Sequence, residues 1–154
     1  MNGTRIEVAK VMGALSYKVL VVEDFPRFRL FVCSLLAQRT EFLVTEACDG
    51  LEAVQRAGTL QPDLVLLDIG LPNLNGMEVA RRISKLAPAT KILFLSQERS
   101  PDIVREALIL GALGYLEKAR AGSELFAAID TVLEGRRFVS SGLELNSASD
   151  RLTH

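Results

Sequence analysis

Charged and hydroxyl side chains follow four short apolar runs of the sequence, at the point where each run stops. In chain order these residues are Glu23, Asp24, Asp68, Ser96, Glu117 and Lys118. If the runs are parallel strands of one sheet, their carboxyl ends share one edge, where open α/β folds bind ligands. Carboxylates packed so closely resist joint ionisation unless a cation bridges them, and Mg²⁺ prefers oxygen ligands of this kind. The pattern therefore favours a magnesium site with a hydroxyl and an ammonium beside it.

Each of these residues has a simpler explanation when it is considered alone. Charged residues are mostly exposed, so a single acid after a strand is usually a solvated loop residue. Lys118 alone would be an ordinary surface charge, and Ser96 alone could start a turn. The functional interpretation rests on the whole set, because its members stand at the ends of four different predicted strands.

The elements that must position these side chains are predicted from hydrophobic patterning. Near-continuous apolar runs are typical of strands buried on both faces, as in a parallel sheet. These runs cover residues 19–22, 64–67, 92–95 and, more weakly, 114–116. Phe42–Ala47 is more mixed, as an edge strand would be.

Between these runs, apolar residues recur at helical spacing. The predicted helices cover residues 28–36 behind Pro26, 51–57, 79–86 before Pro88, 103–108 and 125–133. The end signals of the last two helices are the expected N-caps Ser100 and Ser123, Pro101 at N1, and the terminating Gly111 and Gly135. Five strand–helix repeats with short connections predict a doubly wound α/β sandwich around a parallel sheet.

The composition excludes several other classes of function. The chain has 154 residues, 49% of them hydrophobic, and a formal net charge of -1, so it lacks the basic footprint of a nucleic-acid-binding surface. Its single histidine is the last residue, His154, which excludes Ser–His catalysis and multi-histidine metal sites. No apolar run is long enough to span a bilayer, and residues 1–16 lack the pattern of a signal peptide. We therefore expect a cytoplasmic protein without a membrane partner.

Four segments together resemble the receiver domain of two-component response regulators. The segments are VLVVED ending in Glu23 and Asp24, LVLLDIGLPNLNG around Asp68, ILFLS ending in Ser96, and GALGYLEK ending in Lys118. The resemblance extends over residues 18–135. It implies a flavodoxin-like (βα)5 sandwich whose central parallel sheet has five strands in the order 2-1-3-4-5.

The resemblance also implies a reaction at Asp68. This carboxylate would take a phosphoryl group from a phosphohistidine on a sensor histidine kinase, and aspartyl phosphates are an established covalent intermediate. Glu23, Asp24, Asp68 and the backbone carbonyl of Gly70 would hold Mg²⁺. The chain would then be no general enzyme, because it would catalyse only its own phosphorylation and dephosphorylation.

Three further residues receive roles from the same resemblance. Lys118 and the Ser96 hydroxyl would each pair with a phosphoryl oxygen, as charge neutralisation in phosphoryl transfer requires. Tyr115 would be the aromatic switch, whose ring turns inward as Ser96 moves; the alternative is an ordinary half-buried strand aromatic. The sequence departs from the common family pattern at Ala119, where proline is usual, and at Gly70, which has no side chain to shield the phosphoryl group.

Other functions remain open at this point. Phosphatases of the haloacid-dehalogenase type also use an Asp nucleophile in an α/β fold, but their second acid would fall at Gly70 here. A stand-alone receiver that acts through protein–protein contacts is the other alternative. Steady hydrolysis of a phosphomonoester would favour the phosphatase, and a single stoichiometric labelling would favour a receiver.

Outside the receiver-like region, the sequence divides into two short segments. We expect residues 1–16 to be an N-terminal extension, residues 17–136 to be the receiver domain, and residues 137–154 to be a linker. Residues 138–143 resemble the segment after the last receiver helix in the LuxR/NarL subfamily, and residues 152–154 resemble the start of its helix-turn-helix domain. The chain would then contact DNA only through a C-terminal domain outside this sequence, and it could form a homodimer. The alternative is a receiver with a natural tail.

Overall fold

A six-stranded parallel sheet forms the centre of the computed structural model, which describes residues 15–143. The strands are β1 (Tyr17–Val22), β2 (Phe42–Ala47), β3 (Leu64–Asp68), β4 (Lys91–Ser96), β5 (Gly114–Glu117) and β6 (Phe138–Val139). Their order is β2-β1-β3-β4-β5-β6, and each neighbouring pair is parallel. The predicted fold class and the order of the first five strands are therefore confirmed.

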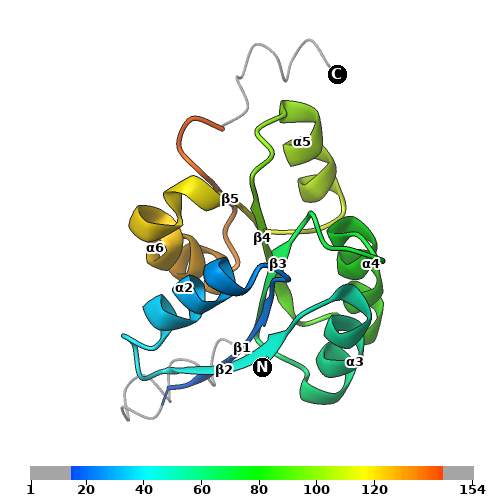
Figure 1. Ribbon diagram of the computed structural model, residues 1–154, viewed down its shortest axis with the longest axis vertical. Coiled ribbons are helices and arrows are strands. Elements are labelled where there is room, and N and C mark those ends of the chain that lie inside the picture. The colour runs from blue at the N-terminus through cyan, green and yellow to red at the C-terminus, as the bar shows by residue number, and fades with distance from the viewer. Residues whose placement is uncertain (1–14, 144–154) are drawn as a thin grey trace.

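Helices cover both faces of this sheet (Figure 1). They are α2 (Pro26–Leu36), α3 (Gly50–Leu60), α4 (Gly76–Leu86), α5 (Pro101–Ile109), the short 3₁₀ helix η1 (Lys118–Arg120) and α6 (Ala121–Leu133). The apolar sides of α2 and α6 pack on one face, and those of α3, α4 and α5 pack on the other. The near-continuous apolar runs follow from this arrangement, because alternate side chains of each central strand enter opposite cores.

The ends of the helices agree with the predicted signals in most places. Pro26 and Pro101 occupy the first turns of α2 and α5, and Gly111 and Gly135 follow α5 and α6 with φ of 102° and 82°. Positive φ at these two stops explains glycine there. The N-cap expected at Ser123 is wrong, because η1 leads directly into α6 and the observed N-cap is Arg120, three residues earlier. The Ser123 hydroxyl instead donates to the Arg120 carbonyl.

The sixth strand was not predicted. Phe138 and Val139 pair in parallel with Gly114 and Tyr115, so the last part of the sheet is built from residues assigned to the linker. Two residues are too few to show a strand pattern in a sequence, and this pairing depends on β5 being in place. The proposed N-terminal extension and the segment that resembles the start of a helix-turn-helix domain lie almost wholly outside the described residues.

Candidate functional site

The predicted site residues lie together at the carboxyl edge of the sheet. Glu23 and Asp24 follow β1, Asp68 ends β3, Ser96 ends β4, and Lys118 follows β5 as the first residue of η1. The neighbours of β1 are β2 and β3, so the chain order of the strands reverses there. Ligand sites of doubly wound folds occur at such a reversal.

Three carboxylates form the centre of this site. Glu23, Asp24 and Asp68 each present an oxygen, and these oxygens lie within 4.8 Å of one another. Glu23 and Asp68 are buried, whereas Asp24 is exposed. The cluster therefore has two oxygen donors inside the molecule and one at its surface, which leaves access from solvent.

The Lys118 ammonium joins the two buried carboxylates. Its Nζ lies 2.6 Å from Glu23 Oε1 and 3.3 Å from Asp68 Oδ2, and it stands 4.9 Å from the centroid of the Phe28 ring. The aliphatic part of the lysine is covered, since 13% of the side chain is exposed. The ammonium is thus held where it faces any group that binds to Asp68.

Backbone and side-chain contacts keep Glu23 in place. Its Oε2 accepts a hydrogen bond from the Phe25 amide at 3.2 Å, and its carbonyl accepts one from Arg29 Nη1 at 2.7 Å. Burial raises the pKa of Glu23 to about 7, and Asp68 adds to this rise while Lys118 opposes it. The ionised form of Glu23 is therefore costly in this site without further positive charge.

The donor set fits a hard divalent cation. Within residues 15–143, Glu23 Oε1 is buried and receives no hydrogen bond of normal geometry, although the Lys118 ammonium is close. Three carboxylate oxygens within 4.8 Å of one another are suited to bind Mg²⁺, which usually keeps several waters as well. Asp24, at the exposed side of the cluster, is placed where such waters would remain.

The loop between β3 and α4 fixes Asp68. Its Oδ1 accepts a hydrogen bond from the Gly70 amide at 3.0 Å, and the Gly76 amide donates to the Ile69 carbonyl at 2.9 Å to close the loop. A Cβ on Gly76 would lie 2.4 Å from the Asp68 carbonyl oxygen and 2.6 Å from Ile69 Cα. Glycine at this position therefore lets the start of α4 approach the backbone of the nucleophile candidate.

We expect Gly76→Ala to lower the free energy of unfolding by about 1–3 kcal/mol, the usual range for overpacking. The new Cβ would clash with backbone atoms of Asp68 and Ile69, so either the backbone at Asp68 or the start of α4 must shift. Gly70→Ala is the matched control, because its Cβ would meet Asp68 Oδ1 at an ordinary 3.7 Å. Urea unfolding of both variants checks the difference; equal stabilities would contradict this interpretation of the loop.

Ser96 and Tyr115 are both tied to the loop after β4. The Ser96 hydroxyl accepts a hydrogen bond from the Glu98 amide at 2.9 Å, and the Tyr115 hydroxyl donates to the Glu98 carbonyl at 2.9 Å. The Tyr115 ring is fully buried rather than half-buried, and burial raises the pKa of its hydroxyl. The structure thus places the expected switch residue in an inward position, where one loop residue contacts both side chains.

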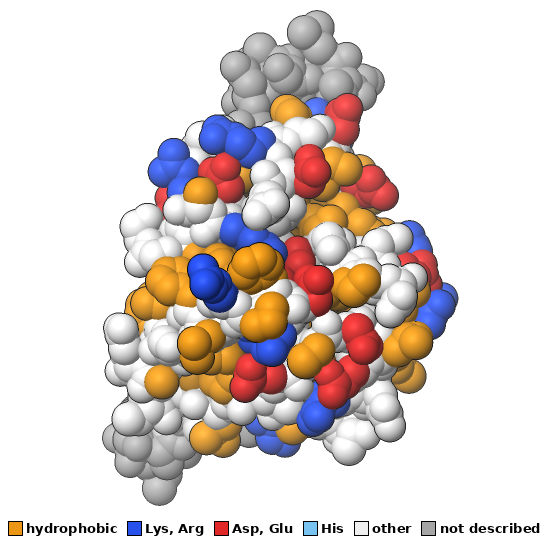
Figure 2. All heavy atoms as spheres, in the orientation of Figure 1, with side chains coloured by type: hydrophobic (Ala, Val, Ile, Leu, Met, Phe, Trp, Pro, Cys, Tyr) orange, Lys and Arg blue, Asp and Glu red, His pale blue; other side chains and the backbone are white. Residues whose placement is uncertain are grey.

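A pocket of about 390 Å³ lies beside the ammonium. Its lining residues are Phe25, Phe28, Gln97, Glu117, Lys118 and Ala119. Phe25 is 55% exposed, and Figure 2 shows hydrophobic side chains gathered over α2. A flat or aromatic group could therefore approach the carboxylates along an apolar wall.

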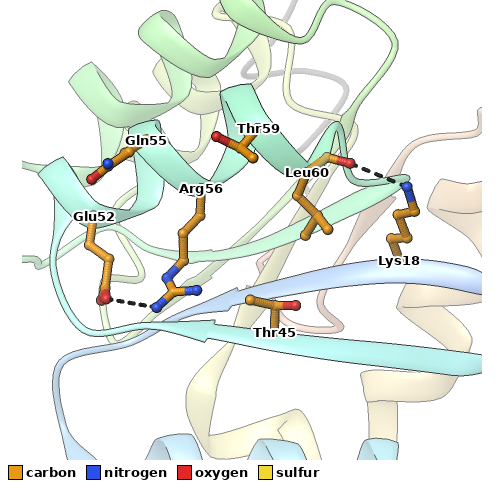
Figure 3. A pocket seen from close by; sticks show the side chains of 7 residues that line it. All are labelled: Lys18, Thr45, Glu52, Gln55, Arg56, Thr59 and Leu60. Carbon is orange, nitrogen blue, oxygen red and sulfur yellow. Dashed lines mark hydrogen bonds and ion pairs between the residues drawn. The ribbon is translucent and has the colours of Figure 1, made fainter.

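A second pocket, of about 520 Å³, lies between α3 and strands β1 and β2 (Figure 3). Its charged side chains already have partners: Arg56 forms an ion pair with Glu52 at 3.2 Å, and Lys18 Nζ donates a hydrogen bond to the Leu60 carbonyl at 3.4 Å. None of the carboxyl-edge residues described above lines it. It therefore contributes nothing to the candidate site.

Sequence reasoning missed one contributor near the site, Ser140, and placed another, Glu117, at this edge without assigning it a role. Ser140 is fully buried, and its hydroxyl accepts a hydrogen bond from the Glu117 amide at 2.8 Å. Glu117 is also buried and contacts Arg99 at 3.3 Å and Arg120 at 3.5 Å. The resemblance of residues 138–143 to the segment after the last receiver helix includes Ser140 but could not reveal its contact with Glu117, which is 23 residues away in the chain.

No helix within residues 15–143 has the length and apolar character that crossing a membrane would require.

Three comparisons relate this chain to known proteins. The model of the response regulator receiver domain matches residues 19–130. The chain is 36% identical over 126 residues to the transcriptional activator protein ExaE of Pseudomonas putida, an alignment that covers 81% of this chain and 59% of that protein. It is 33% identical over 143 residues to the transcriptional regulatory protein PdtaR of Mycobacterium tuberculosis, which covers 91% of this chain and 68% of the relative.

Among solved structures, the crystal structure of a two-component response regulator of the LuxR family from Aurantimonas sp. SI85-9A1 is similar. Its TM-score is 0.82 at 30% sequence identity, with 89% of this chain and 99% of that chain covered. The chain spans about three-fifths of the length of the Pseudomonas putida relative.

Proposed function

The chain belongs to the response regulator receiver domain family, and from this membership we propose that Asp68 accepts a phosphoryl group from a phosphohistidine of a sensor histidine kinase. The observation that carries the proposal is the contact of one ammonium, that of Lys118, with the Asp68 carboxylate inside a cluster of three acids. Relatives of the chain are transcriptional regulators.

The surroundings of the three acids favour Asp68 as the nucleophile. Glu23 is fully buried beneath Lys118, so a donor phosphorus cannot reach it directly. Asp24 is exposed, but no ion pair among the described residues connects it to Lys118. Asp68 combines a contact with Lys118, an oxygen oriented by the Gly70 amide and a side chain that is 7% exposed, whereas the side chain of Glu23 is 0% exposed.

The transfer exchanges one bond to phosphorus for another. A carboxylate oxygen of Asp68 forms the new O–P bond, and the P–N bond to the donor imidazole breaks, leaving its electron pair on the ring nitrogen. Lys118 would neutralise one phosphoryl oxygen, and the Ser96 hydroxyl would donate to another. Phosphoryl transfer depends mainly on such positioning and charge neutralisation.

Glu23, Asp24, Asp68 and the Gly70 carbonyl would hold Mg²⁺, which when bound supplies positive charge against the phosphoryl oxygens. The oxygens of the three carboxylates, which lie within 4.8 Å of one another, support this assignment. No histidine lies within residues 15–143, since the single histidine of this sequence is His154, and this supports an imidazole that a partner protein supplies. The exposed Phe25 and the pocket beside Lys118 support a protein donor that approaches along α2.

The output of the receiver is proposed to be transcription regulation in the cytoplasm. The similarity to transcriptional regulators and to a LuxR-family response regulator supports this output. DNA would be contacted by a separate domain that is not among the described residues. Pairing of two receivers would be one way to carry the signal.

Treatment with acetyl phosphate tests the proposed reaction. With Mg²⁺ we expect one phosphoryl group per chain by intact-mass measurement, and with a chelator we expect none. Acetate is then the leaving group, and a P–O bond breaks in place of the P–N bond. Continuous hydrolysis of a generic phosphomonoester, without a labelled protein, would instead support a phosphatase and overturn the receiver mechanism.

A further inference from the structure

The segment that follows α6 returns to the carboxyl edge of the sheet. The Ser140 amide donates to the Tyr115 carbonyl at 3.0 Å, which extends the pairing of β6 with β5 by one residue. Ser140 Oγ then accepts the hydrogen bond from the Glu117 amide at 2.8 Å. Glu117 is directly followed by Lys118, so the serine holds the backbone from which the ammonium extends.

Side chains on either side of Ser140 strengthen this attachment. Leu143 is buried in the same apolar cluster as Tyr115, and Val139 packs against that cluster. A Cβ on Gly142 would lie 3.6 Å from an Nη2 atom of Arg99 and of Arg120, the two arginines that contact Glu117. The segment thus contacts the loop after β4, the inward tyrosine and the backbone beside Lys118.

We propose that residues 138–143 form a latch that completes the phosphoacceptor site, with Ser140 as the positioning residue for Lys118. This inference rests on the proposed function, because it assigns Ser140 to the same reaction. Loss of the Ser140 hydroxyl leaves the Glu117 amide, a buried donor, without its acceptor. The start of η1 must then shift to find another partner, and Lys118 shifts with it.

The coupling must operate in both directions. If the seated latch changes the equilibrium free energy of phosphorylation at Asp68, phosphorylation must change the equilibrium for seating of the latch by the same factor. The latch is also the stretch that leaves the receiver fold toward the C-terminus. A conformational change caused by phosphorylation at Asp68 would therefore be transmitted to the residues after the latch through the buried hydrogen bond between Ser140 and the Glu117 amide and through the contacts beside it.

The test uses the full chain with Ser140→Ala and the neighbouring control Ser141→Ala. Ser141 is exposed, and its hydroxyl bonds to Glu124 rather than to the sheet. We expect Ser140→Ala to reduce the maximal rate of phosphorylation by acetyl phosphate about tenfold, since small misplacements of a reacting geometry have effects of this size or larger. The half-saturating concentration should change less than about twofold, and Ser141→Ala should keep both values.

Two further measurements separate positioning from mere stability. Amide exchange followed by NMR should accelerate at Glu117 in Ser140→Ala, and in the wild type it should change at Ser140 on phosphorylation. If Ser140→Ala does not fold, Ser140→Cys preserves most of the side chain with a weaker acceptor and should show the same rate defect.

The outcomes are distinct. A Ser140→Ala protein that is less stable but is phosphorylated at the wild-type maximal rate would contradict the proposed role of the latch. An amide exchange rate at Ser140 that is the same before and after phosphorylation of the wild type would contradict it as well. A wild-type chain that acetyl phosphate never labels would overturn the proposed function itself, independently of any Ser140 variant.

Discussion

Asp68→Asn should abolish the uptake of a phosphoryl group from acetyl phosphate. The amide retains the shape of the side chain and can still accept the hydrogen bond from the Gly70 amide, but it is not a nucleophile for phosphorus. Intact-mass measurement in the presence of Mg²⁺ should therefore show the full shift in the wild type and none in the variant.

The exposed Asp102, at the start of α5, provides a matched control. Asp102→Asn removes a carboxylate that is outside the cluster of three acids and is paired with Arg105, so this variant should be labelled as the wild type is. A phosphoryl group that persists in Asp68→Asn would move the reaction to another residue and reject the central proposal.

Asp24→Ala should slow Mg²⁺-dependent phosphorylation by about a hundredfold or more. Asp24 is the exposed acid of the cluster and has no ion pair among residues 15–143, so its removal should leave the fold intact. It also relieves repulsion with the neighbouring carboxylates. The expected defect is therefore weaker cation binding, which magnesium titration followed by calorimetry and by phosphorylation rate would measure.

Asp102→Ala is the corresponding control and should bind Mg²⁺ as the wild type does. If Asp24→Ala kept the wild-type dependence of its rate on magnesium concentration, Asp24 could not be a ligand. A variant that no longer folds, judged by circular dichroism, would instead assign Asp24 a structural role and contradict the metal assignment.

Much of the site could be predicted because parallel strands end at a common edge. Asp68 and Ser96 are the last residues of β3 and β4, and Lys118 follows β5 directly. An apolar run that stops at a polar residue marks both the strand and the place of its last side chain. No information beyond the order of the runs was needed to bring these groups together.

The rest depended on contacts that local sequence does not encode. The fully buried position of Tyr115 depends on packing with Leu143 and on the Glu98 carbonyl. The role of Ser140 depends on a two-residue strand whose pairing partner is already folded. The N-cap prediction at Ser123 failed because the preceding residues form the 3₁₀ helix η1, which continues directly into α6. Ser123 therefore lies inside the helix and not at its start.

The short strand β6 has a consequence for association between molecules. Without it, β5 would be the edge of the sheet, and the carbonyls of Leu113 and Tyr115 would lose the amides of Phe138 and Ser140 as donors. Exposed strand edges are templates for pairing with other chains. The short segment of residues 138–143 therefore protects the sheet against intermolecular strand addition. A fragment that stopped at Gly135 would lack that protection.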